Sequence, residues 1–354
     1  MIRIAIVGTG SWAEDHVRGY RELRGVKIVA CCDMVAGKAE EFARRHGIPR
    51  WYSHVEPMFA REKLDAVSVA VSDAGHAAVS LAAMARGLAV LCEKPLATNI
   101  KDARRMVRAA RRYGVVNLVN FRCREAPVLA RARQWVAEGA LGELRHVQAE
   151  YLQCWLVSRI WGDWRKGEGW LWRMSRTHGG GVLADVGCHI LDAVVYVAGG
   201  IDRLSCTLRC FPKGAPGNRC RGYLLDANDS AVITAEFTGG ATGTITATRW
   251  ASGHANTVRL GVYGTKGGLE IDLDKSWTQL RLSRGRDLDR CAWKTVSCGR
   301  RDSMYARFVH AIRTGRTPEP TFEDGIRVQE LLTACERSAQ LGRWVSLSGQ
   351  TGRG

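Results

Sequence analysis

The sequence predicts a two-domain protein, in which a parallel, doubly wound α/β domain precedes an α+β domain with a large, mostly antiparallel sheet. Two observations predict this fold. Over residues 1–122, short apolar segments alternate with amphipathic segments across short connections, as strands and helices do around a parallel sheet. From about residue 203, successive apolar segments are separated by glycine, as in an antiparallel sheet.

The first domain should begin with a buried strand, because its first apolar run is short and ends in a glycine turn. The strands expected over 1–122 are Ile2–Val7, Val26–Cys32, Asp65–Val71, Ala89–Cys92 and Val115–Asn120. The helices expected between them are Trp12–Arg24, Ala36–His46, Ala77–Arg86 and Lys101–Tyr113. The last helix is strongly basic but has an apolar face formed by Met106, Val107 and Ala110, which indicates a surface helix.

The pattern changes after Arg122, so we divide the chain into domains 1–122 and 123–354. The second domain should open with a helix at Pro127–Glu138 and a strand at Leu144–Leu152, and a further helix should follow Gly187. Its later strands are expected at Leu204–Phe211, Ser230–Phe237, Gly243–Trp250, Val258–Tyr263 and Gly268–Leu273. C-terminal helices are expected at Tyr305–Ile312 and Gly325–Gln340.

The composition is that of an ordinary globular protein, with 354 residues, 46% hydrophobic and 25% charged. No run of about 18 apolar residues is present and the N-terminal run is too short for a signal peptide. We therefore expect a cytoplasmic protein without a membrane partner. The twelve cysteines are scattered without zinc-type spacing, which indicates free thiols and no metal site.

The net charge of +17 raises the possibility of a nucleic-acid partner. The basic excess is spread evenly over both domains and forms no basic tail. We therefore expect incidental binding to polyanions but no specific nucleic-acid partner.

A glycine-rich turn follows the first strand and has the form Gly-x-Gly-x-x-Ala, from Gly8 and Gly10 to Ala13. In this context the turn is typical of a dinucleotide site, because glycines admit the pyrophosphate to the backbone and the helix N-terminus supplies N–H donors. Asp33 closes the second strand, where a carboxylate accepts hydrogen bonds from ribose hydroxyls and repels a 2′-phosphate. Residue 34 is Met rather than Arg, so NAD is favoured over NADP. The alternative is a plain glycine turn with a capping aspartate.

Two further motifs carry ionisable groups. Glu93 and Lys94 end the fourth strand, at the edge of a parallel sheet where ligands bind, although a surface ion pair would give the same pattern. Asp185 and His189 lie four residues apart, so a helix would place them on one face, with Asp192 three residues further on. A carboxylate beside a histidine suits a general base, but it is also compatible with a buried, capped histidine.

Together these motifs resemble the family of glucose–fructose oxidoreductase, inositol dehydrogenase and MocA, over nearly the whole chain. The resemblance implies an N-terminal Rossmann domain, a C-terminal domain with a large open-faced sheet, and assembly as a homodimer or homotetramer. It implies that Lys94, Asp185 and His189 form the catalytic group. Asn120-Phe-Arg122 and Trp172-Arg173 also fit the family pattern. The cofactor-binding residues that it implies are Gly8, Gly10, Ser11, Trp12, Asp33, Val71, His76, Glu93, Lys94, Trp172 and Arg173.

One segment departs from the family pattern. The family often carries Thr-Pro-Asn, two residues and then His after the third strand, whereas this chain has Val71-Ser72-Asp73-Ala74-Gly75-His76. The histidine is kept and the Thr-Pro-Asn is not. This difference concerns how the nicotinamide side of the cofactor is held.

Five tryptophans lie between residues 155 and 172, in a segment similar to sugar and cyclitol dehydrogenases of the family. Indole rings stack on the apolar faces of sugars, while amide and phenol groups bind hydroxyls. We expect Arg122, Tyr151, Gln153 and Trp155 to contact the substrate. Packing at a domain or subunit interface is the alternative for any single tryptophan.

The leading hypothesis is an NAD-dependent oxidoreductase that transfers a hydride between nicotinamide and a hydroxyl-bearing ring carbon of a sugar, sugar derivative or cyclitol. NADP remains a possible cofactor. One alternative is an NAD-dependent glycosidase that oxidises a ring carbon transiently, eliminates the aglycone and returns the hydride. Another is a non-catalytic, ligand-sensing regulator on the same fold, although such a protein does not need a proton relay. Polyanion binding is supported by the charge alone.

Overall fold

The computed structural model describes residues 1–35, 37–316 and 318–347, and the chain forms two compact units. The first unit comprises Met1–Phe121 and Asp302–Gln329, and the second comprises Arg122–Arg301 together with the chain from Glu330 onward. Ala36, with which the second expected helix began, lies outside the described residues.

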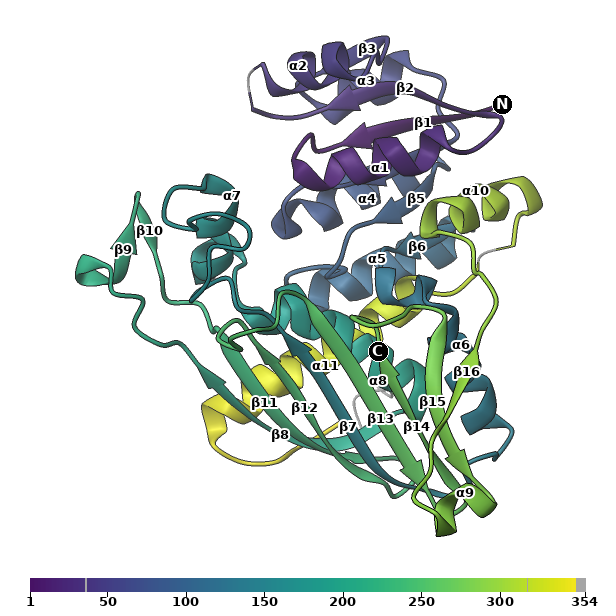
Figure 1. The fold of residues 1–354 in the computed structure, drawn as a ribbon. Coiled ribbons are helices and arrows are strands. Elements are labelled where there is room, and N and C mark those ends of the chain that lie inside the picture. The colour runs from purple at the N-terminus through teal and green to yellow at the C-terminus, as the bar shows by residue number, and fades with distance from the viewer. Residues whose placement is uncertain (36, 317, 348–354) are drawn as a thin grey trace. The chain divides into compact units, whose positions relative to one another are not determined.

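A parallel sheet of six strands forms the centre of the first unit, in the order β3-β2-β1-β4-β5-β6 (Figure 1). This is the strand order of a Rossmann fold, which confirms the predicted class. The strands are β1 (Ile2–Val7), β2 (Val26–Cys32), β3 (Arg50–Tyr52), β4 (Ala66–Val69), β5 (Ala89–Cys92) and β6 (Asn117–Val119). The central strands β4 and β5 are buried along their whole length, because helices cover both faces of the sheet.

The helices of the first unit begin and end where local signals place them. They are α1 (Ser11–Arg21), α2 (Lys38–Arg45), α3 (Val55–Arg61), the short turn η1 (Asp73–Gly75), α4 (His76–Met84), α5 (Ile100–Tyr113) and α10 (Met304–Thr314). In α5, the Asn99 side chain accepts a hydrogen bond from the Asp102 amide, and Gly114 ends the helix with a φ of +60°. Its buried face contains the expected Met106, Val107 and Ala110.

Helix α10 packs in the first unit, although the division of the sequence at residue 122 grouped it with the second. Its side chains Met304, Tyr305, Phe308 and Val309 join Ile2, Ile4, Tyr20 and Leu91 in one buried cluster. The apolar face of this helix was visible in the sequence, but its packing partner was not, because a helical pattern does not identify the surface that it covers.

The second unit contains a sheet of nine strands in the order β16-β15-β14-β13-β7-β12-β11-β8-β17. All neighbouring pairs are antiparallel except β7 and β12, which confirms the mostly antiparallel sheet. The strands are β7 (Leu144–Leu152), β8 (Ile201–Arg209), β11 (Ser230–Phe237), β12 (Thr242–Thr248), β13 (Thr257–Gly264), β14 (Gly267–Asp272), β15 (Gln279–Arg284), β16 (Lys294–Ser297) and β17 (Val345–Ser346). A separate hairpin joins β9 (Arg219–Cys220) to β10 (Tyr223–Leu224).

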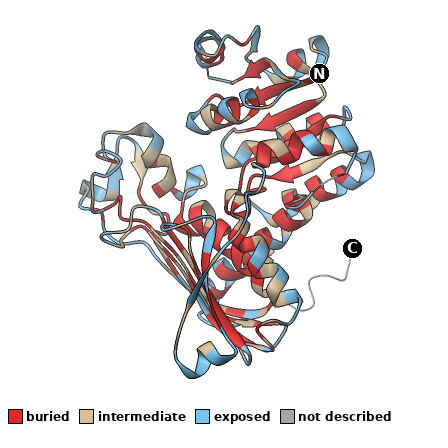
Figure 2. Cartoon of the chain, turned by 45° about the vertical axis from the view of Figure 1, so that its right-hand side comes forward, coloured by how far each residue is buried: buried red, intermediate tan, exposed pale blue. Residues whose placement is uncertain are grey.

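Helices cover one face of this sheet, and polar residues occupy the other. The helical segments are η2 (Arg122–Glu125), α6 (Pro127–Ala137), α7 (Glu168–Leu171), η3 (Trp172–Met174), η4 (Arg176–His178), η5 (Leu183–Gly187), α8 (Cys188–Ala198), η6 (Pro216–Asn218), α9 (Arg286–Asp289) and α11 (Phe322–Leu341), the last of which begins in the first unit. Along β12, Gly243, Ile245 and Ala247 are buried, whereas the threonines between them face outward. Figure 2 shows the same alternation of buried and exposed residues along the strands.

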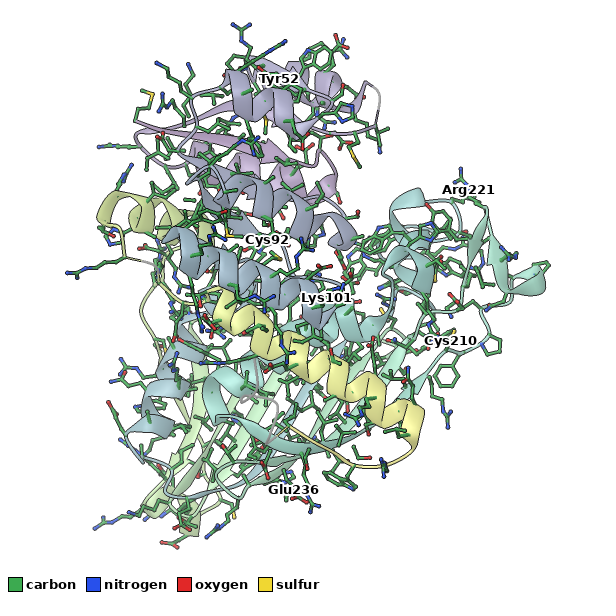
Figure 3. All side chains as sticks on the ribbon, turned by 180° about the vertical axis from the view of Figure 1, so that it is seen from behind. Tyr52, Cys92, Lys101, Cys210, Arg221 and Glu236 are labelled. Atoms are coloured by element: carbon green, nitrogen blue, oxygen red, sulfur yellow. The ribbon has the colours of Figure 1, made fainter. Side chains whose placement is uncertain are left out.

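All twelve cysteines lie in the described part of the chain as free thiols, and Cys92, labelled in Figure 3, is buried at the end of β5. Among the described residues, no helix is both long and apolar enough to cross a membrane. In the same residues no group of His, Cys, Asp and Glu is arranged to hold a metal ion.

Candidate active site

The glycine turn after β1 has two glycines with different structural roles. Gly8 has a φ of +91°, and a Cβ atom there would overlap the carbonyl group of Ala70, so this position excludes other residues. Gly10 precedes α1, and a Cβ atom there would meet no other atom within 4 Å. The space beside Gly10 therefore lies open at the N-terminal end of α1, where Ser11 and Trp12 form the first turn. An open space at a helix N-terminus fits the pyrophosphate of a dinucleotide.

Asp33 is held at the carboxyl end of β2 by the glycine turn itself. The amide and hydroxyl groups of Thr9 donate to Oδ2 of Asp33 at 2.9 and 2.7 Å, and the Val35 amide donates to Oδ1 at 2.9 Å. These bonds fix the orientation of the carboxylate before any ligand arrives. An oriented carboxylate at this strand end fits the ribose hydroxyls of NAD.

His76, the histidine kept from the family pattern, is fully buried at the start of α4. Its Nδ1 atom lies 2.8 Å from the carbonyl oxygen of Pro95, and its Nε2 atom lies 3.2 Å from that of Val71. Burial alone would lower the pKa of this ring, but the nearby Cys92 and Asp73 and the Pro95 carbonyl raise the pKa to about 10. His76 thus links the segment after β4 to the segment that follows Lys94.

Glu93 belongs to a chain of buried polar groups, of which His16, Ser68 and Tyr20 were not among the expected site residues. Its Oε1 atom accepts from Nε2 of His16 at 2.9 Å and from Nδ2 of Asn120 at 2.5 Å. Ser68 Oγ contacts His16 Nδ1 at 2.6 Å and the Tyr20 hydroxyl at 2.9 Å. Burial by itself raises the pKa of Glu93, but the hydrogen bonds from His16 and Asn120 and the charge of Lys94 lower it to about 2. Glu93 is therefore an anion beside Lys94, itself only 8% exposed.

In the second unit, Asp185 lies in a π-helical turn that leads into α8. Residues Leu183–Gly187 form this turn, and His189 lies in the first turn of α8. The helix expected after Gly187 is thus present as α8, whereas Asp185 lies in the π-helical turn before it and not in the same α-helix as His189. Inserted π-helical turns are frequent at functional sites, because they alter the direction in which side chains project.

Two arginines bind the Asp185 carboxylate. Nη2 of Arg249 lies 2.8 Å from Asp185 Oδ2, and Nε of Arg173 lies 3.4 Å from the same oxygen. The sequence analysis had placed Arg173 at the cofactor and had not selected Arg249. Arg249 directly follows β12, a strand whose outward residues are polar, and nothing in the local pattern indicates that its side chain is buried.

The glycine run before Asp185 allows this arrangement. A Cβ atom on Gly180 would overlap the backbone of Trp172 and Arg173, and Gly181 has a φ of +136°. The Gly181 amide donates to the carbonyl oxygen of Arg173 at 2.9 Å. Only glycine permits so close an approach of two backbone segments, and this approach brings Arg173 beside Asp185.

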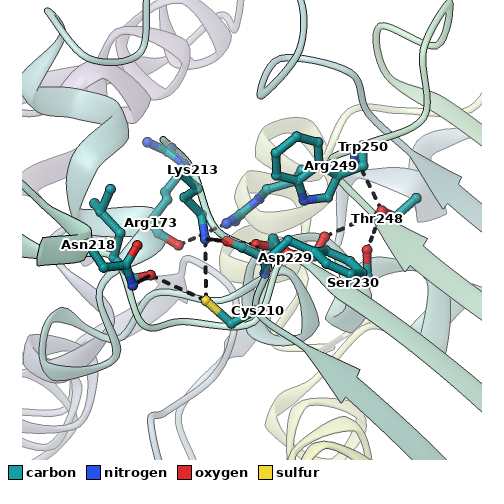
Figure 4. Close-up of polar contacts among 11 residues, drawn as sticks. Arg173, Cys210, Lys213, Asn218, Asp229, Ser230, Thr248, Arg249 and Trp250 are labelled. Atoms are coloured by element: carbon teal, nitrogen blue, oxygen red, sulfur yellow. Dashed lines mark hydrogen bonds and ion pairs between the residues drawn. The ribbon is translucent and has the colours of Figure 1, made fainter. Parts of the chain in front are cut away.

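A second buried ion pair lies next to Arg249. Nζ of Lys213 lies 2.8 Å from Asp229 Oδ2, and neither side chain is more than 1% exposed. The Arg249 amide donates to the Asp229 carbonyl oxygen at 3.0 Å. Figure 4 shows these groups together with Arg173 and Cys210. Arg249, the residue that follows β12, is therefore held by its side chain at Asp185 and by its amide at Asp229.

The expected substrate residues Tyr151, Gln153 and Trp155 lie at the end of β7 and just beyond it, all at least nine-tenths buried. Gln153 accepts from Trp155 Nε1 at 3.0 Å and donates to Asn256 Oδ1 at 2.8 Å. Burial raises the pKa of the Tyr151 phenol, whose ring centre lies 6.3 Å from that of His189. The structure thus brings Tyr151 and His189 together, and it gives Gln153 a role in holding Trp155.

The tryptophan segment contains both packing and accessible rings. Trp155 and Trp164 belong to a buried cluster with Leu171 and Met174, which is packing inside the second unit, whereas the alternative had named a domain or subunit interface. Trp172 is only partly buried, and the Arg173 guanidinium carbon lies 4.5 Å from its ring centre. The remaining members of the segment, Trp161 and Trp170, stack with ring centres 5.7 Å apart.

The candidate residues fall into two groups, one in each unit. Glu93 and Lys94 lie in the first unit with the glycine turn, Asp33 and His76, whereas Asp185, His189, Tyr151 and Arg173 lie in the second. Arg122 opens the second unit in η2. Asp192 forms a buried ion pair with Arg124, with bonds of 2.8 and 2.5 Å, which gives this carboxylate a structural role.

Comparisons with known proteins match both units. Residues 2–121 match the model of an oxidoreductase family with an NAD-binding Rossmann fold, and residues 129–270 match the GFO/IDH/MocA C-terminal domain. Trans-1,2-dihydrobenzene-1,2-diol dehydrogenase of Sus scrofa is 30% identical over 79% of this chain and 77% of that protein. Levoglucosan dehydrogenase of Pseudarthrobacter phenanthrenivorans is 26% identical over 87% of this chain and 86% of that protein. The crystal structure of an oxidoreductase domain protein from Kribbella flavida superposes with a TM-score of 0.85 at 28% identity, covering 98% of this chain and all of that one.

Proposed function

The chain belongs to the Gfo/Idh/MocA family of oxidoreductases, and from this membership we propose that it is an NAD-dependent dehydrogenase of a sugar, sugar derivative or cyclitol. The observation that carries the cofactor assignment is the Asp33 carboxylate, which the glycine turn holds by three hydrogen bonds at the end of β2. The substrate class is supported by relatives such as levoglucosan dehydrogenase, whose name refers to a sugar derivative.

The residues of the first unit fit NAD. Gly8 and Gly10 admit the pyrophosphate to the N-terminal turn of α1, with Ser11 and Trp12, and Asp33 accepts from the ribose hydroxyls. When bound, NAD supplies the acceptor for a hydride. The nicotinamide side is assigned to Val71, His76, Glu93, Lys94, Trp172 and Arg173.

The proton chemistry is assigned to three residues. His189 takes the proton of the substrate hydroxyl as general base, since imidazole exchanges protons near neutral pH. Asp185 orients the substrate and balances charge, because its two arginine partners stabilise the carboxylate. The Lys94 ammonium favours the ionised form of the hydroxyl. Arg122, Tyr151, Gln153 and Trp155 surround the ring.

A substrate screen tests this function. Inositols and pyranoses, with levoglucosan among them, are offered with NAD and with NADP, and the absorbance of the reduced cofactor is followed. We expect activity with at least one polyol and NAD, and a loss of kcat/KM for deoxy analogues, since each unpaired buried polar group costs about 1–3 kcal/mol. Equal activity on an aliphatic alcohol contradicts the polyol assignment. Cleavage of a glycoside without net NADH formation supports the glycosidase alternative, and ligand binding without turnover supports the regulator.

We further propose that the protein works in the cytoplasm as a homodimer or homotetramer. The family resemblance supports assembly, and the helices of the second unit leave one face of the nine-stranded sheet open for a contact. Light scattering coupled to size-exclusion chromatography measures the mass in solution, and a particle of 39.0 kDa at micromolar concentration contradicts this assignment.

A further inference from the structure

Arg249 is a fully buried cation near the proposed reaction site in the second unit. Its side chain is 0% exposed, although arginine is seldom fully buried without a partner. Nη2 lies 2.8 Å from Asp185 Oδ2, and Nη1 donates to the carbonyl oxygen of Arg173 at 2.8 Å. The guanidinium carbon lies 5.0 Å from the centre of the Trp155 ring. One side chain therefore contacts three residues that all lie at least 64 positions earlier in the sequence.

The contacts of the two arginines restrict the rotation of the Asp185 carboxylate. Arg249 and Arg173 approach the same oxygen, Oδ2, so both guanidinium groups oppose its rotation. Planar guanidinium groups suit this task because their donors have fixed directions. The backbone holds the arrangement as well, since the Asp185 amide donates to the Gly181 carbonyl oxygen and the Gly181 amide donates to that of Arg173.

Because the Arg249–Asp185 pair is buried, removing either partner should be costly. Removing one partner of a buried ion pair leaves an uncompensated charge, which is far more costly than losing an exposed pair. Burial lowers the pKa of Arg249, while the nearby charge of Asp185 opposes this effect. The carboxylate that keeps Arg249 ionised is the carboxylate that we assign to the reaction.

We infer that Arg249 is a positioning residue, which holds the Asp185 carboxylate in the orientation that the dehydrogenase reaction needs. The inference rests on the proposed function for the role of Asp185, but the pairing itself can be measured without turnover. Arg249 acts through its contacts with Asp185 and with the Arg173 carbonyl oxygen. A small error in the position of a reacting group lowers the rate by up to about 100-fold, so the effect falls on kcat rather than on KM.

A double-mutant cycle tests the inference. Asp185→Asn, Arg249→Met and the double variant are assayed with levoglucosan, D-glucose and myo-inositol as probe substrates and saturating NAD. We expect R249M to lower kcat about 10- to 100-fold with less than a twofold change in KM. We also expect the double variant to have the same kcat as D185N alone, because the proposed effect of Arg249 on the rate depends on the Asp185 carboxylate. A purely structural arginine would instead give losses that multiply.

A matched control is available in the same sheet. Arg259 on β13 pairs with Glu150 and Asp272, and its side chain is 41% exposed. R259M removes an arginine ion pair and should leave kcat and KM unchanged. Equal kcat values for R249M and R259M overturn the inference, as does a multiplicative loss in the cycle.

Two further measurements keep the inference testable if a variant folds poorly or no probe is oxidised. Arg249→Lys keeps the charge but cannot bind both Asp185 and the Arg173 carbonyl, so it should also lower kcat, by about tenfold. Urea unfolding of the four proteins in the cycle measures the coupling between residues 185 and 249 without any substrate. If the wild type oxidises no probe but residues 185 and 249 are strongly coupled in stability, the result counts against the proposed dehydrogenase and supports the ion pair. If the two residues are not coupled, the inference is overturned whatever the activity.

Discussion

Glu93 in the first unit and Asp185 in the second are carboxylates assigned to the same reaction, yet different groups stabilise them. Glu93 accepts hydrogen bonds from the side chains of His16 and Asn120, which belong to the same parallel sheet and its first helix. Asp185 binds two arginines, one from η3 and one from the end of β12. The first is held within a single α/β fold, and the second by segments that only the completed tertiary structure brings together.

This difference concerns how the surroundings of the two carboxylates can change. The donors to Glu93 extend into a buried chain through Ser68 to Tyr20, so any substitution there disturbs the core of the sheet. The arginines of Asp185 lie beside the tryptophan segment and the glycine run, where the packing is specific to this part of the chain. We therefore expect substitutions around Glu93 to cost more stability than substitutions around the arginines of Asp185.

The largest expected effect is a loss of turnover with unchanged NAD binding, because we assign proton transfer to the second unit and NAD binding to the first. His189→Asn should lower kcat by about 10²–10⁴, the usual contribution of a general base, while the affinity for NAD stays unchanged. Steady-state kinetics and calorimetric titration with NAD provide the two measurements. The exposed His178, eleven residues earlier, offers a matched control in His178→Asn, which should be neutral. Normal turnover of the His189 variant would remove this residue from the mechanism.

A smaller effect concerns the stability that Glu93 provides. Its pKa of about 2 in the folded protein is below the ordinary value of 4.5, so ionised Glu93 stabilises the fold above pH 4.5, and this contribution is lost as the pH falls toward 2. Glu93→Gln should therefore cost about 3 kcal/mol at pH 7, and the difference from wild type should shrink between pH 4.5 and 3. Urea unfolding at these pH values measures it. Glu40→Gln, at an exposed position on α2, serves as the control, and an equal pH dependence of both variants contradicts the role given to burial and to His16.

Within the first unit, the two glycines of the turn after β1 should differ in whether their replacement lowers stability or NAD affinity. Gly8→Ala should destabilise the protein by about 1–3 kcal/mol, because its φ is positive and the Ala70 carbonyl leaves no space. Gly10→Ala should leave the melting temperature unchanged and weaken NAD binding about tenfold, or 1.4 kcal/mol, because its side chain enters the open space before α1. Thermal unfolding and NAD titration distinguish the two. Equal loss of stability would mean that Gly10 also serves packing.

The smallest expected effect is a change of cofactor preference. Asp33→Ser removes the charge that opposes a 2′-phosphate, and it should raise the use of NADP relative to NAD by about tenfold. The ratio of kcat/KM values for the two cofactors measures it. A wild-type enzyme that already prefers NADP tenfold contradicts the role given to Asp33.

Local patterns were sufficient to predict most of the first unit and much of the second. The parallel strands, the glycine turn and Asp33 follow from short-range spacing, and the helices over 100–113 and 304–314 follow from their apolar faces. The short strands β3, β16 and β17 were missed, because they contain few buried residues. Strand β15 was also missed, although three of its six residues are buried.

The contacts of the site were harder to predict, since they join distant segments. His16 and Ser68 are 52 residues apart, and Arg249 and Asp185 are 64 apart. A polar residue in a strand or helix has the same local pattern whether it faces water or a buried partner, so only the tertiary structure identifies it. The π-helical turn at Leu183–Gly187 was missed for a different reason, because one inserted residue leaves the helical pattern almost unchanged.

The return of α10 to the first unit has a consequence for biosynthesis. Part of the core around Ile4 and Tyr20 consists of Met304, Tyr305 and Phe308, which are translated roughly 180 residues after β6 is complete. At about 5–20 residues per second, the ribosome needs roughly 10–40 s to supply them. During this time the apolar surface that α10 covers has no partner from its own chain. The N-terminal fold of this protein is therefore among the last parts to be completed, and its nascent chain is a natural client for chaperones that shield apolar surface.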